Sequence, residues 1–476
     1  MYGLIIQKAL SECMGLTLFL ACFLILNDDL IFSGTSFDCY STFGFYKTAI
    51  TDYFAFSAKL IICFFSAFYF FMIADFLKEY KLTSFEYLLI ILFAVLGLIL
   101  LCSSNDLLTA YLSIELISLS SYVLAAFKKT SSYSAEAGIK YLVTGAISSA
   151  FFLLGSSFMY VYSGSINISD FWLILSNEGW FNSNENLGLL EPFFEIGLTF
   201  ILFSLFIKLA LAPFHIWSLD VYEGSPTIST FFFAVITKLS FFVFLTRLNY
   251  IATFKYHEAW QFYGVVIALF SVFVGSFGGL RQRKLKTLLA YSSVSHMGYA
   301  LLAFSAGSRF GAEMLLFYLI IYMLSGLAVW FVILATRVHR KRYTEKFNKE
   351  LGDLVLLRKS NPALAISLSL TMFSIAGIPP LVGFFAKMGV FLSVLHVKYY
   401  FVSLFAILCS VVSTFYYIRI IKILYFENLL VGKLYYPIIS SKSILFSTLV
   451  FSLLFLFFNP TFLYLKVYKA ILCSFV

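Results

Sequence analysis

Long apolar runs separated by short polar segments fill the sequence, and this alternation limits the chain to a membrane fold. A helix that crosses the hydrocarbon core of a bilayer needs about 20 mostly apolar residues, and we count about thirteen such runs. Backbone groups in lipid have no water to bond with, so only helices or closed barrels cross it. Runs of this length predict an all-α polytopic membrane protein. The expected spans are 3–26, 52–77, 84–104, 106–127, 133–163, 192–222, 226–249, 258–279, 283–305, 311–337, 361–396, 399–426 and 443–466.

The composition agrees with this class and excludes several functions. Only 12% of the residues are charged and 61% are hydrophobic, whereas soluble domains are roughly 25% charged. The net charge of +9 does not indicate nucleic-acid binding, because the basic residues lie in short loops between apolar runs, as membrane orientation requires. The seven cysteines form no CxxC pair and no Cys/His cluster, so zinc and iron–sulfur ligation lack support. We expect no metal site and no cofactor site in this chain.

Lysine and arginine are unevenly distributed between alternate loops. Loops after odd-numbered runs carry only scattered bases such as Lys47, Arg247 and Lys398. By the positive-inside rule, the loops after even-numbered runs face the cytoplasm or matrix. With thirteen runs, the amino terminus lies on that side and the carboxyl terminus on the other. The bases after even-numbered runs are Lys78, Lys81, Lys128, Lys129, Arg281, Arg283, Lys284, Lys286, those of 337–359, Lys433 and Lys442.

Two of the runs are interrupted by proline, at Pro213 in the sixth run and at Gly377, Pro379 and Pro380 in the eleventh. The breaks are five runs apart, so runs three to seven and eight to twelve predict two five-helix units, each with a broken fourth helix. Because five is odd, the second unit enters the membrane from the opposite face, as in the inverted repeats of transporters. The alternative is that the prolines only kink core helices. The predicted organisation is 1–83 N-terminal helices, 84–250 first unit, 251–427 second, inverted unit and 428–476 C-terminal helix.

Ionisable residues inside the runs are the candidate functional residues. Charge at the bilayer centre costs on the order of 3 kcal/mol, so such residues persist mainly where a polar path runs through the protein. A lysine away from water exchanges its proton more readily, and a nearby carboxylate controls its charge. Histidine titrates near neutral pH and can relay protons. The predicted proton relay contains Glu115, Lys208, Lys238, His296 and Lys387, with Lys140 as a further candidate.

Simpler explanations exist for most of these residues. Glu115 and Lys208 could form only a structural ion pair. Lys140 and Lys387 lie close enough to span ends for their side chains to reach the membrane surface, and His296 could be a hydrogen-bonded core histidine. Lys238 lies in the middle of its run among apolar neighbours, and it is the hardest to explain without function.

Other polar residues near the relay have expected roles in structure. His215, Asp220 and Glu223 follow the first break, and we expect them to form its rim rather than a catalytic set. Hydroxyl groups and waters would have to bridge the ionisable residues. The hydroxyl residues expected to do so are Ser292, Ser293, Ser295 and Tyr299.

Five stretches carry a family resemblance: LSIELISLSSYVLAAF, EAGIKYLVTGAISSAFFLLG, KLALAPFHIWSLDVYEGSPT, KLKTLLAYSSVSHMGYAL and FSIAGIPPLVGFFAK. They resemble NADH dehydrogenase subunit 2, an antiporter-like membrane subunit of respiratory complex I, over roughly residues 84–425. The larger members of that family have fourteen spans with the glutamate on the fifth, whereas Glu115 falls on the fourth in this sequence. The resemblance therefore implies that the first family helix is missing from the N-terminal part. It also implies a proton path through Glu115, Lys208, Lys238 and Lys387, with His296 in the central hydrophilic axis and Lys140 as a further buried lysine.

The resemblance also implies where the chemistry of the complex takes place. Flavin, iron–sulfur clusters and the quinone site belong to other subunits, so this chain would pump protons without a redox site of its own. Its expected partners are other complex I membrane subunits, especially neighbouring antiporter-like subunits, and membrane lipids. The 59 Phe and 31 Tyr residues suggest an organelle-encoded protein of the mitochondrial inner membrane, and a plastid or bacterial homologue is the alternative.

Two other functions remain open at this point. A subunit of a multisubunit cation/proton antiporter would share the broken helices, although the PFHIWSLDVYEGSPT version of that stretch favours complex I. A structural membrane scaffold without ion transfer is the third hypothesis. The retained Glu115, Lys208, Lys238 and Lys387 argue against a scaffold.

Overall fold

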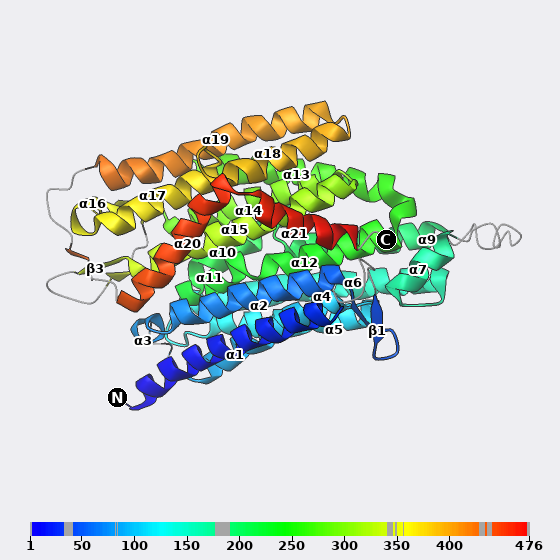
Figure 1. Cartoon of the computed structure of the whole chain (residues 1–476), viewed down its shortest axis with the longest axis horizontal. Helices are drawn as coiled ribbons and strands as arrows, with labels where there is room; N and C mark the ends of the chain where they lie inside the picture. The colour runs from blue at the N-terminus through cyan, green and yellow to red at the C-terminus, as the bar shows by residue number, and fades with distance from the viewer. Residues whose placement is uncertain are drawn as a thin grey trace, which may run out of the picture.

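The computed structural model describes residues 2–32, 41–80, 82, 84–176, 191–339, 346–347, 350–355, 357–427, 434–435 and 440–473. Helices lie side by side along the long axis of the molecule, with α1 at one edge and α19 at the other (Figure 1). Some of the basic residues that predicted the orientation lie outside the described part, namely Lys81, Arg340, Lys341, Arg342, Lys349 and Lys433. The helices are α1 (Tyr2–Phe32), α2 (Tyr53–Ile73), α3 (Phe76–Glu79), α4 (Glu86–Ser103), α5 (Leu107–Ala126), α6 (Ser132–Ser163), α7 (Ile168–Ser176), α9 (Glu191–Lys208), α10 (Ile216–Gly224), α11 (Thr227–Val235), α12 (Thr237–Thr246), the π-helix η2 (Arg247–Ala252), the 3₁₀-helix η3 (Phe254–Tyr256), α13 (His257–Gly279), α14 (Leu285–Ser305), α15 (Arg309–Ala335), the 3₁₀-helix η4 (Leu351–Leu354), α16 (Leu357–Ser360), α17 (Pro362–Ala376), α18 (Val382–His396), α19 (Tyr400–Tyr425), α20 (Ser440–Phe458) and α21 (Thr461–Leu472).

The prediction of a helical polytopic membrane protein is confirmed. Within the described residues, nine helices are long and apolar enough to cross a membrane, or ten if the bent pair α20–α21 forms one span. The broken helices α17 and α18 are apolar but shorter. Helices occupy every predicted run in order, while the number of thirteen membrane crossings stays a prediction.

Short strands of the described residues lie at the ends of the helix bundle. Strands β1 (Thr42–Gly44) and β2 (Ala49–Thr51) form an antiparallel hairpin. Strands β3 (Arg337–His339), β4 (Lys346–Phe347) and β5 (Leu434–Tyr435) form a small sheet in the order β4-β3-β5. These strands join loops and do not cross the membrane.

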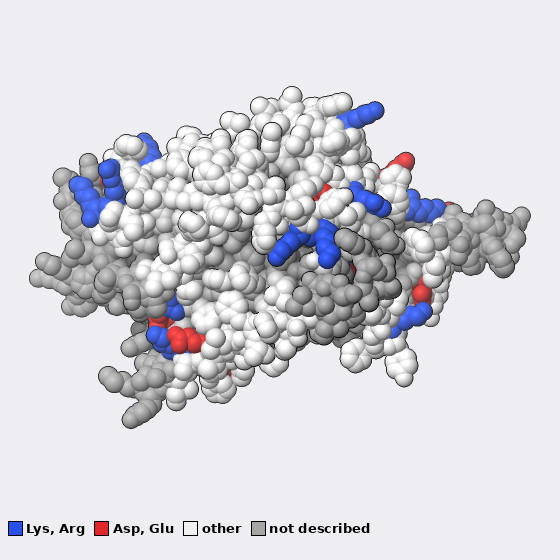
Figure 2. Space-filling model, viewed as in Figure 1, with Lys and Arg blue, Asp and Glu red and all other residues white. Residues whose placement is uncertain are grey.

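The most deeply buried helices lie at the centre of the bundle. The most apolar stretch of Thr227–Ala252 is 100% buried and that of Arg309–Ala335 is 94% buried, whereas that of Ser132–Ser163 is only 28% buried. Helices α12 and α15 therefore form the core, and α6 presents most of its surface outward. In Figure 2 most of the visible face is uncharged, and the charged side chains gather near the two ends and over α21.

Both predicted helix breaks are present. Helix α9 ends at Lys208, and Ala210 adopts a left-handed conformation with φ of 58° before α10 begins at Ile216. Helix α17 ends at Ala376, and Gly377 adopts a left-handed conformation with φ of 82°. Proline cannot donate a backbone hydrogen bond and disfavours helical geometry in the residue before it. The prolines after each helix therefore prevent it from continuing, and backbone carbonyls are left without helical partners inside the membrane.

Corresponding helices of the two predicted units make corresponding contacts. Helix α4 packs on α5 and α6 on the broken pair α9–α10, while α13 packs on α14 and α15 on the broken pair α17–α18. The units touch where α10 meets α14 and where α11 meets α15. These contacts agree with two similar units. The domain boundaries and the inverted relation of the units stay predictions.

The prediction of one continuous span over 443–466 is wrong. The chain bends by 82° between Phe458 and Thr461. Pro460 lies at this bend, and a proline there cannot continue the hydrogen-bond ladder of α20. Helix α21 then packs against α15 and α2, so the end of the chain turns back onto the bundle.

Candidate functional site

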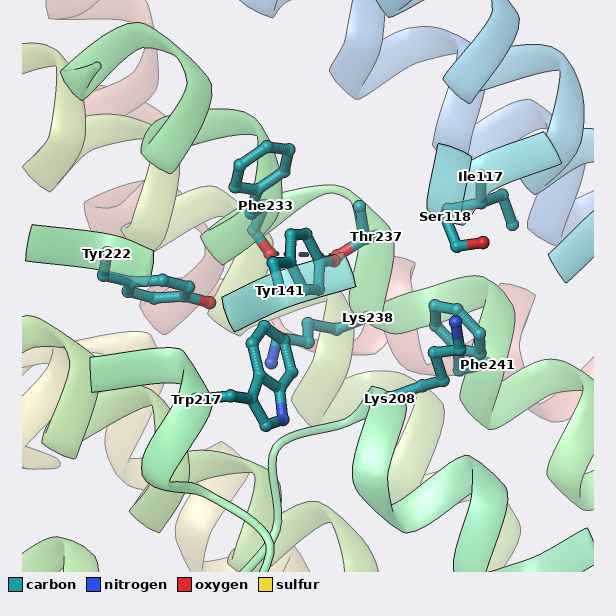
Figure 3. Close-up of a pocket in the computed structure, with 10 residues that line it drawn as sticks. All are labelled: Ile117, Ser118, Tyr141, Lys208, Trp217, Tyr222, Phe233, Thr237, Lys238 and Phe241. Atoms are coloured by element: carbon teal, nitrogen blue, oxygen red, sulfur yellow. Dashed lines mark hydrogen bonds between the residues drawn. The ribbon is translucent and has the colours of Figure 1, made fainter. Parts of the chain in front are cut away.

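Two polar cavities lie inside the bundle, and each contains predicted relay residues. The first site comprises Glu115, Ser118, Tyr122, Lys208 and Lys238 with the residues that line the cavity between the two lysines. Figure 3 shows this cavity, with the Lys238 side chain between Tyr141 and Trp217 and Lys208 to one side of them, near Phe241. It leaves a volume of about 10 Å³ for the centre of a water molecule, which is room for about one water.

Lys238 is fixed at the first helix break. It lies at the start of α12 and is only 3% exposed. Its Nζ donates a hydrogen bond to the carbonyl oxygen of Leu209, at a distance of 3.1 Å. Leu209 directly follows α9, where carbonyl groups without helical partners favour a positive charge. The break therefore supplies the polar partner that a lysine at this depth needs.

Lys208 is the last residue of α9, and its Nζ donates a hydrogen bond to the hydroxyl of Tyr122 at 3.3 Å. Glu115 is half-buried on α5, and its charge interacts with that of Lys208. The two groups do not form an ion pair within 4.0 Å in the described part of the chain. A direct structural ion pair, the simpler explanation considered for these residues, is therefore absent from this structure.

The second site comprises His296, Tyr318, Tyr417 and Lys387. Lys387, on α18, is 6% exposed, and its Nζ donates a hydrogen bond to the carbonyl oxygen of Ala376 at 2.7 Å. Ala376 is the last residue of α17, so this lysine also binds the end of a broken helix. A side chain at Gly377 would lie 2.7 Å from Cδ of Lys387. Glycine at this position therefore leaves the space that the lysine occupies.

His296 is buried on α14 between two tyrosines. Its Nδ1 is 2.6 Å from the hydroxyl of Tyr318 and its Nε2 is 3.1 Å from the hydroxyl of Tyr417. One ring nitrogen of a neutral imidazole donates and the other accepts, so both tyrosines have a suitable partner in either tautomer. Between His296 and Lys387 lies a cavity in which the centre of a water molecule can occupy about 20 Å³.

The predicted bridging serines of α14 face tyrosine hydroxyls. Ser292 lies near Tyr417, which contacts His296, and Ser295 lies near Tyr416. Both serine hydroxyls donate to backbone carbonyls of α14. Ser293 donates to the backbone carbonyl of Ala290 and lies near Tyr222, which lines the first cavity. Ser293 and Tyr222 therefore connect the surroundings of the two sites.

Lys140 lies apart from both sites. Its side chain is 44% exposed, and its Nζ forms ion pairs with Glu136 at 2.8 Å and with Asp220 at 2.7 Å. The family resemblance implies a buried lysine at this position. In this chain the Lys140 side chain is exposed, because α6 is an outer helix. Asp220 and Glu223 connect α10 to its neighbours through Lys140 and Lys284, as expected for a rim.

The buried ion pair between Arg247 and Asp52 is not among the sequence predictions. Arg247 was counted as a loop residue, but it is 3% exposed in η2, and this assignment is wrong. Its guanidinium donates to both carboxylate oxygens of Asp52 at 2.7 and 3.0 Å. Asp52 also caps α2 by accepting from Ala55. No local pattern in the sequence marks the pairing, since 195 positions separate the partners.

The family of the chain follows from comparison with known proteins. Residues 104–413 match the family described as NADH:quinone oxidoreductase/Mrp antiporter, transmembrane. The chain belongs to this family. The NADH-ubiquinone oxidoreductase chain 2 of Marchantia polymorpha is 38% identical over 429 residues, which cover 90% of this chain and 85% of that relative. The resemblance inferred from the five sequence stretches is therefore confirmed.

Solved structures share the architecture of this family member. A chain of respiratory complex I from Thermus thermophilus is 27% identical, with a TM-score of 0.77, and the match covers 96% of this chain and 93% of that one. A chain of the Mrp complex from Dietzia sp. DQ12-45-1b has a TM-score of 0.80 at 18% identity, covering 100% and 96%. The second likeness shows a common fold alone.

Within the described residues, no group of three or more His, Cys, Asp or Glu side chains could hold a metal ion. The polar groups of the two sites are lysine, histidine, carboxylate and hydroxyl groups, which exchange protons. Their arrangement at helix breaks inside a membrane bundle is suited to moving protons rather than to covalent chemistry.

Proposed function

We propose that this chain is a proton-translocating membrane subunit of a NADH:quinone oxidoreductase. The observation that carries this proposal is the placement of two buried lysines, Lys238 and Lys387, against carbonyl groups at two helix breaks. Such a lysine keeps a polar partner whether it is charged or neutral, so its proton can leave and return without loss of the fold. The 38% identity with a chain 2 subunit over most of the chain supports the assignment to this complex.

The relay begins in the first site. Glu115 controls the charge of Lys208, because a carboxylate favours the charged form of a nearby lysine. Protonation or movement of Glu115 releases the proton of Lys208, which passes through the cavity toward Lys238. Tyr222, beside the first cavity, and Ser293, on the helix that carries His296, lie between the first site and the second. There His296 and Lys387 receive the proton.

This chain moves protons without oxidation or reduction of its own. Flavin, iron–sulfur clusters and quinone are held by other subunits of the complex, and the partners of this chain are the neighbouring antiporter-like subunits and membrane lipids. It is an organelle-encoded, multi-pass protein of the mitochondrial inner membrane. The likeness to the Marchantia chain 2 protein supports this location.

The alternative of a cation/proton antiporter subunit has less support. The likeness of this chain to the Mrp chain is one of fold alone, because the sequence identity is 18%. The identity is 27% with the complex I chain and 38% with the chain 2 relative. A scaffold without ion transfer leaves the two buried lysines unexplained.

Two variants test the proposal, Glu115→Gln and Lys208→Met, in membrane vesicles that contain the assembled complex. Each should lower NADH-driven proton pumping and coupled turnover by about tenfold or more, while the complex remains assembled. Normal pumping by both variants would contradict the relay. Loss of assembly in both would favour the scaffold, and a purified assembly that lacks flavin and iron–sulfur clusters would favour the antiporter.

A further inference from the structure

The region between Glu115 and Lys208 contains two hydroxyl groups that the proposed relay does not yet use. Ser118 and Tyr122 lie three and seven positions after Glu115 on α5, so all three side chains share one face of the helix. Both hydroxyl residues are buried, with exposures of 3% and 7%. They are therefore shielded from bulk solvent.

The polar groups of these residues follow one another from Lys208 to Glu115. Lys208 Nζ donates to the Tyr122 hydroxyl at 3.3 Å. Ser118 lies near the Tyr122 hydroxyl, one helical turn earlier on α5, and Ser118 Oγ lies 3.1 Å from Oε2 of Glu115. Each hydroxyl can accept one hydrogen bond while it donates another. The series can therefore carry a proton over the gap that separates the lysine from the carboxylate.

The surroundings of Tyr122 hold its hydroxyl in this series. The Tyr122 ring packs edge-on against Tyr141 at 4.8 Å, and Tyr141 stacks on Trp217 at 4.7 Å. The indole of Trp217 donates to the carbonyl of Ile207 at 2.9 Å, one residue before Lys208. The same aromatic group thus fixes both the tyrosine and the end of α9 that carries the lysine.

A glycine on α6 provides the space for the Tyr122 hydroxyl. A Cβ atom at Gly145 would lie 1.5 Å from Oη of Tyr122. No side chain other than hydrogen fits at this position while the tyrosine keeps its place. The hydroxyl therefore sits in a space formed by a second helix, independently of its bond to Lys208.

We propose that Ser118 and Tyr122 form a hydroxyl relay that transfers a proton between Lys208 and Glu115. A proton leaves the ammonium group of Lys208 for the Tyr122 oxygen, the Tyr122 proton passes to Ser118, and the Ser118 proton passes to the Glu115 carboxylate. The products are a neutral amine and a carboxylic acid, and both hydroxyl groups are restored. The reverse transfer recharges Lys208, which then releases its proton toward Lys238. Only N–H and O–H bonds change.

Ser118 can also interrupt this relay. Its Oγ lies 3.1 Å from the backbone carbonyl oxygen of Glu115 as well as 3.1 Å from the carboxylate. Its single proton can point to one acceptor at a time. Rotation toward the carbonyl disconnects Glu115, and rotation toward the carboxylate connects it.

This inference rests on the proposed function, and the test uses the assembled complex in membrane vesicles. Tyr122→Phe removes one hydroxyl and keeps the ring. Ser118→Val removes the other, and Ser118→Thr is its isosteric partner that retains a hydroxyl. Tyr122→Phe and Ser118→Val should each lower proton pumping about tenfold, whereas Ser118→Thr should stay within about twofold of wild type. Ser120→Ala is the matched control, since Ser120 donates only to backbone carbonyls of Leu116 and Ile117, and it should pump normally.

A double variant separates a relay from two structural effects. If the hydroxyls act in one series, the double variant Tyr122→Phe/Ser118→Val should pump no less than either single variant. The first substitution already interrupts the series, so the two losses of pumping do not multiply. Multiplied losses, equal losses in Ser118→Thr and Ser118→Val, or normal pumping by Tyr122→Phe would each overturn the relay. If Glu115→Gln and Lys208→Met also pump normally, the proposed function itself fails.

Discussion

The two sites hold their buried lysines in the same way but surround them with different groups. Lys238 and Lys387 each donate to a carbonyl group at the end of a broken helix. The first site also contains a carboxylate, Glu115, whose charge interacts with Lys208. Within the described residues, Lys387 has no hydrogen bond or ion pair with a carboxylate, and the ionisable group that shares its cavity is His296.

This difference separates two ways to control a buried proton. A carboxylate and an ammonium group stabilise each other, so the first site can remain charged until Glu115 is neutralised. Two cations repel each other, so we expect the second site to hold one proton that is either on His296 or on Lys387. Under the proposed function, we therefore expect the first site to act as a switch and the second as a transfer point.

The largest effect is expected from removal of the lysine in the second site. Lys387→Met should reduce NADH-driven proton pumping by more than about tenfold, because no carboxylate or second lysine among the described lining residues can replace it. Pumping and NADH oxidation are measured together in vesicles. Lys398→Met is the control, since Lys398 is exposed beyond the end of α18, and it should pump normally. Normal pumping by Lys387→Met would remove the second site from the path.

Gly377→Ala should impair the second site without removal of any charge. The added Cβ would lie 2.7 Å from Cδ of Lys387, and φ of 82° is unfavourable for alanine, by about 1–2 kcal/mol. We expect pumping to fall several-fold, less than in Lys387→Met. The matched control is Gly352→Ala, where a Cβ meets no atom within 4 Å. Equal pumping in the two glycine variants would show that the position of Lys387 is not set by this contact.

Tyr318→Phe tests the transfer role of His296. It removes the hydroxyl that lies 2.6 Å from Nδ1, and loss of one hydrogen bond is worth about 1 kcal/mol, so pumping should fall by about fivefold. Tyr87→Phe removes a buried hydroxyl that bonds Ser229, away from both cavities. The two variants are compared for pumping at several pH values. Indistinguishable profiles would mean that His296 is only a core residue.

The smallest effect is expected at Asp106, a carboxylate in the turn between α4 and α5. Burial, and secondarily the charge of Asp170, raise the pKa of Asp106. A raised carboxyl pKa disfavours the ionised form in the folded protein, so Asp106 destabilises the fold at neutral pH. Asp106→Asn should therefore slightly slow thermal inactivation of the complex at pH 7, and this gain should disappear below the usual pKa range of aspartate. Faster inactivation at pH 7 would show instead that the fold needs the ionised carboxylate.

The sequence was sufficient to predict the features that depend on local chemistry. Apolar length predicted the helices, and proline predicted both breaks, because proline acts on its own turn of helix. The depth of Lys238 and Lys387 followed from their positions within apolar runs. Pro460 is an equally local signal of the bend between α20 and α21, which the predicted span over 443–466 does not include.

Features that depend on which helices meet could not be predicted. Lys140 and Lys238 both lie inside apolar runs, yet one is on an outer helix and the other in the core, because burial depends on neighbours that are distant in sequence. The pairing of Arg247 with Asp52 also depends on neighbours that are distant in sequence. The tyrosines that contact His296 come from α15 and α19, and no local pattern marks them among the 31 tyrosines of the chain.

The central claim is that protons pass through lysines held at the two helix breaks. The most direct test is the number of protons translocated per NADH oxidised, in vesicles containing the assembled complex with Lys238→Met and Lys387→Met combined. We predict that this ratio or the coupled turnover falls by about tenfold while the flavin and iron–sulfur content of the complex is unchanged. A wild-type ratio at wild-type turnover would contradict the account.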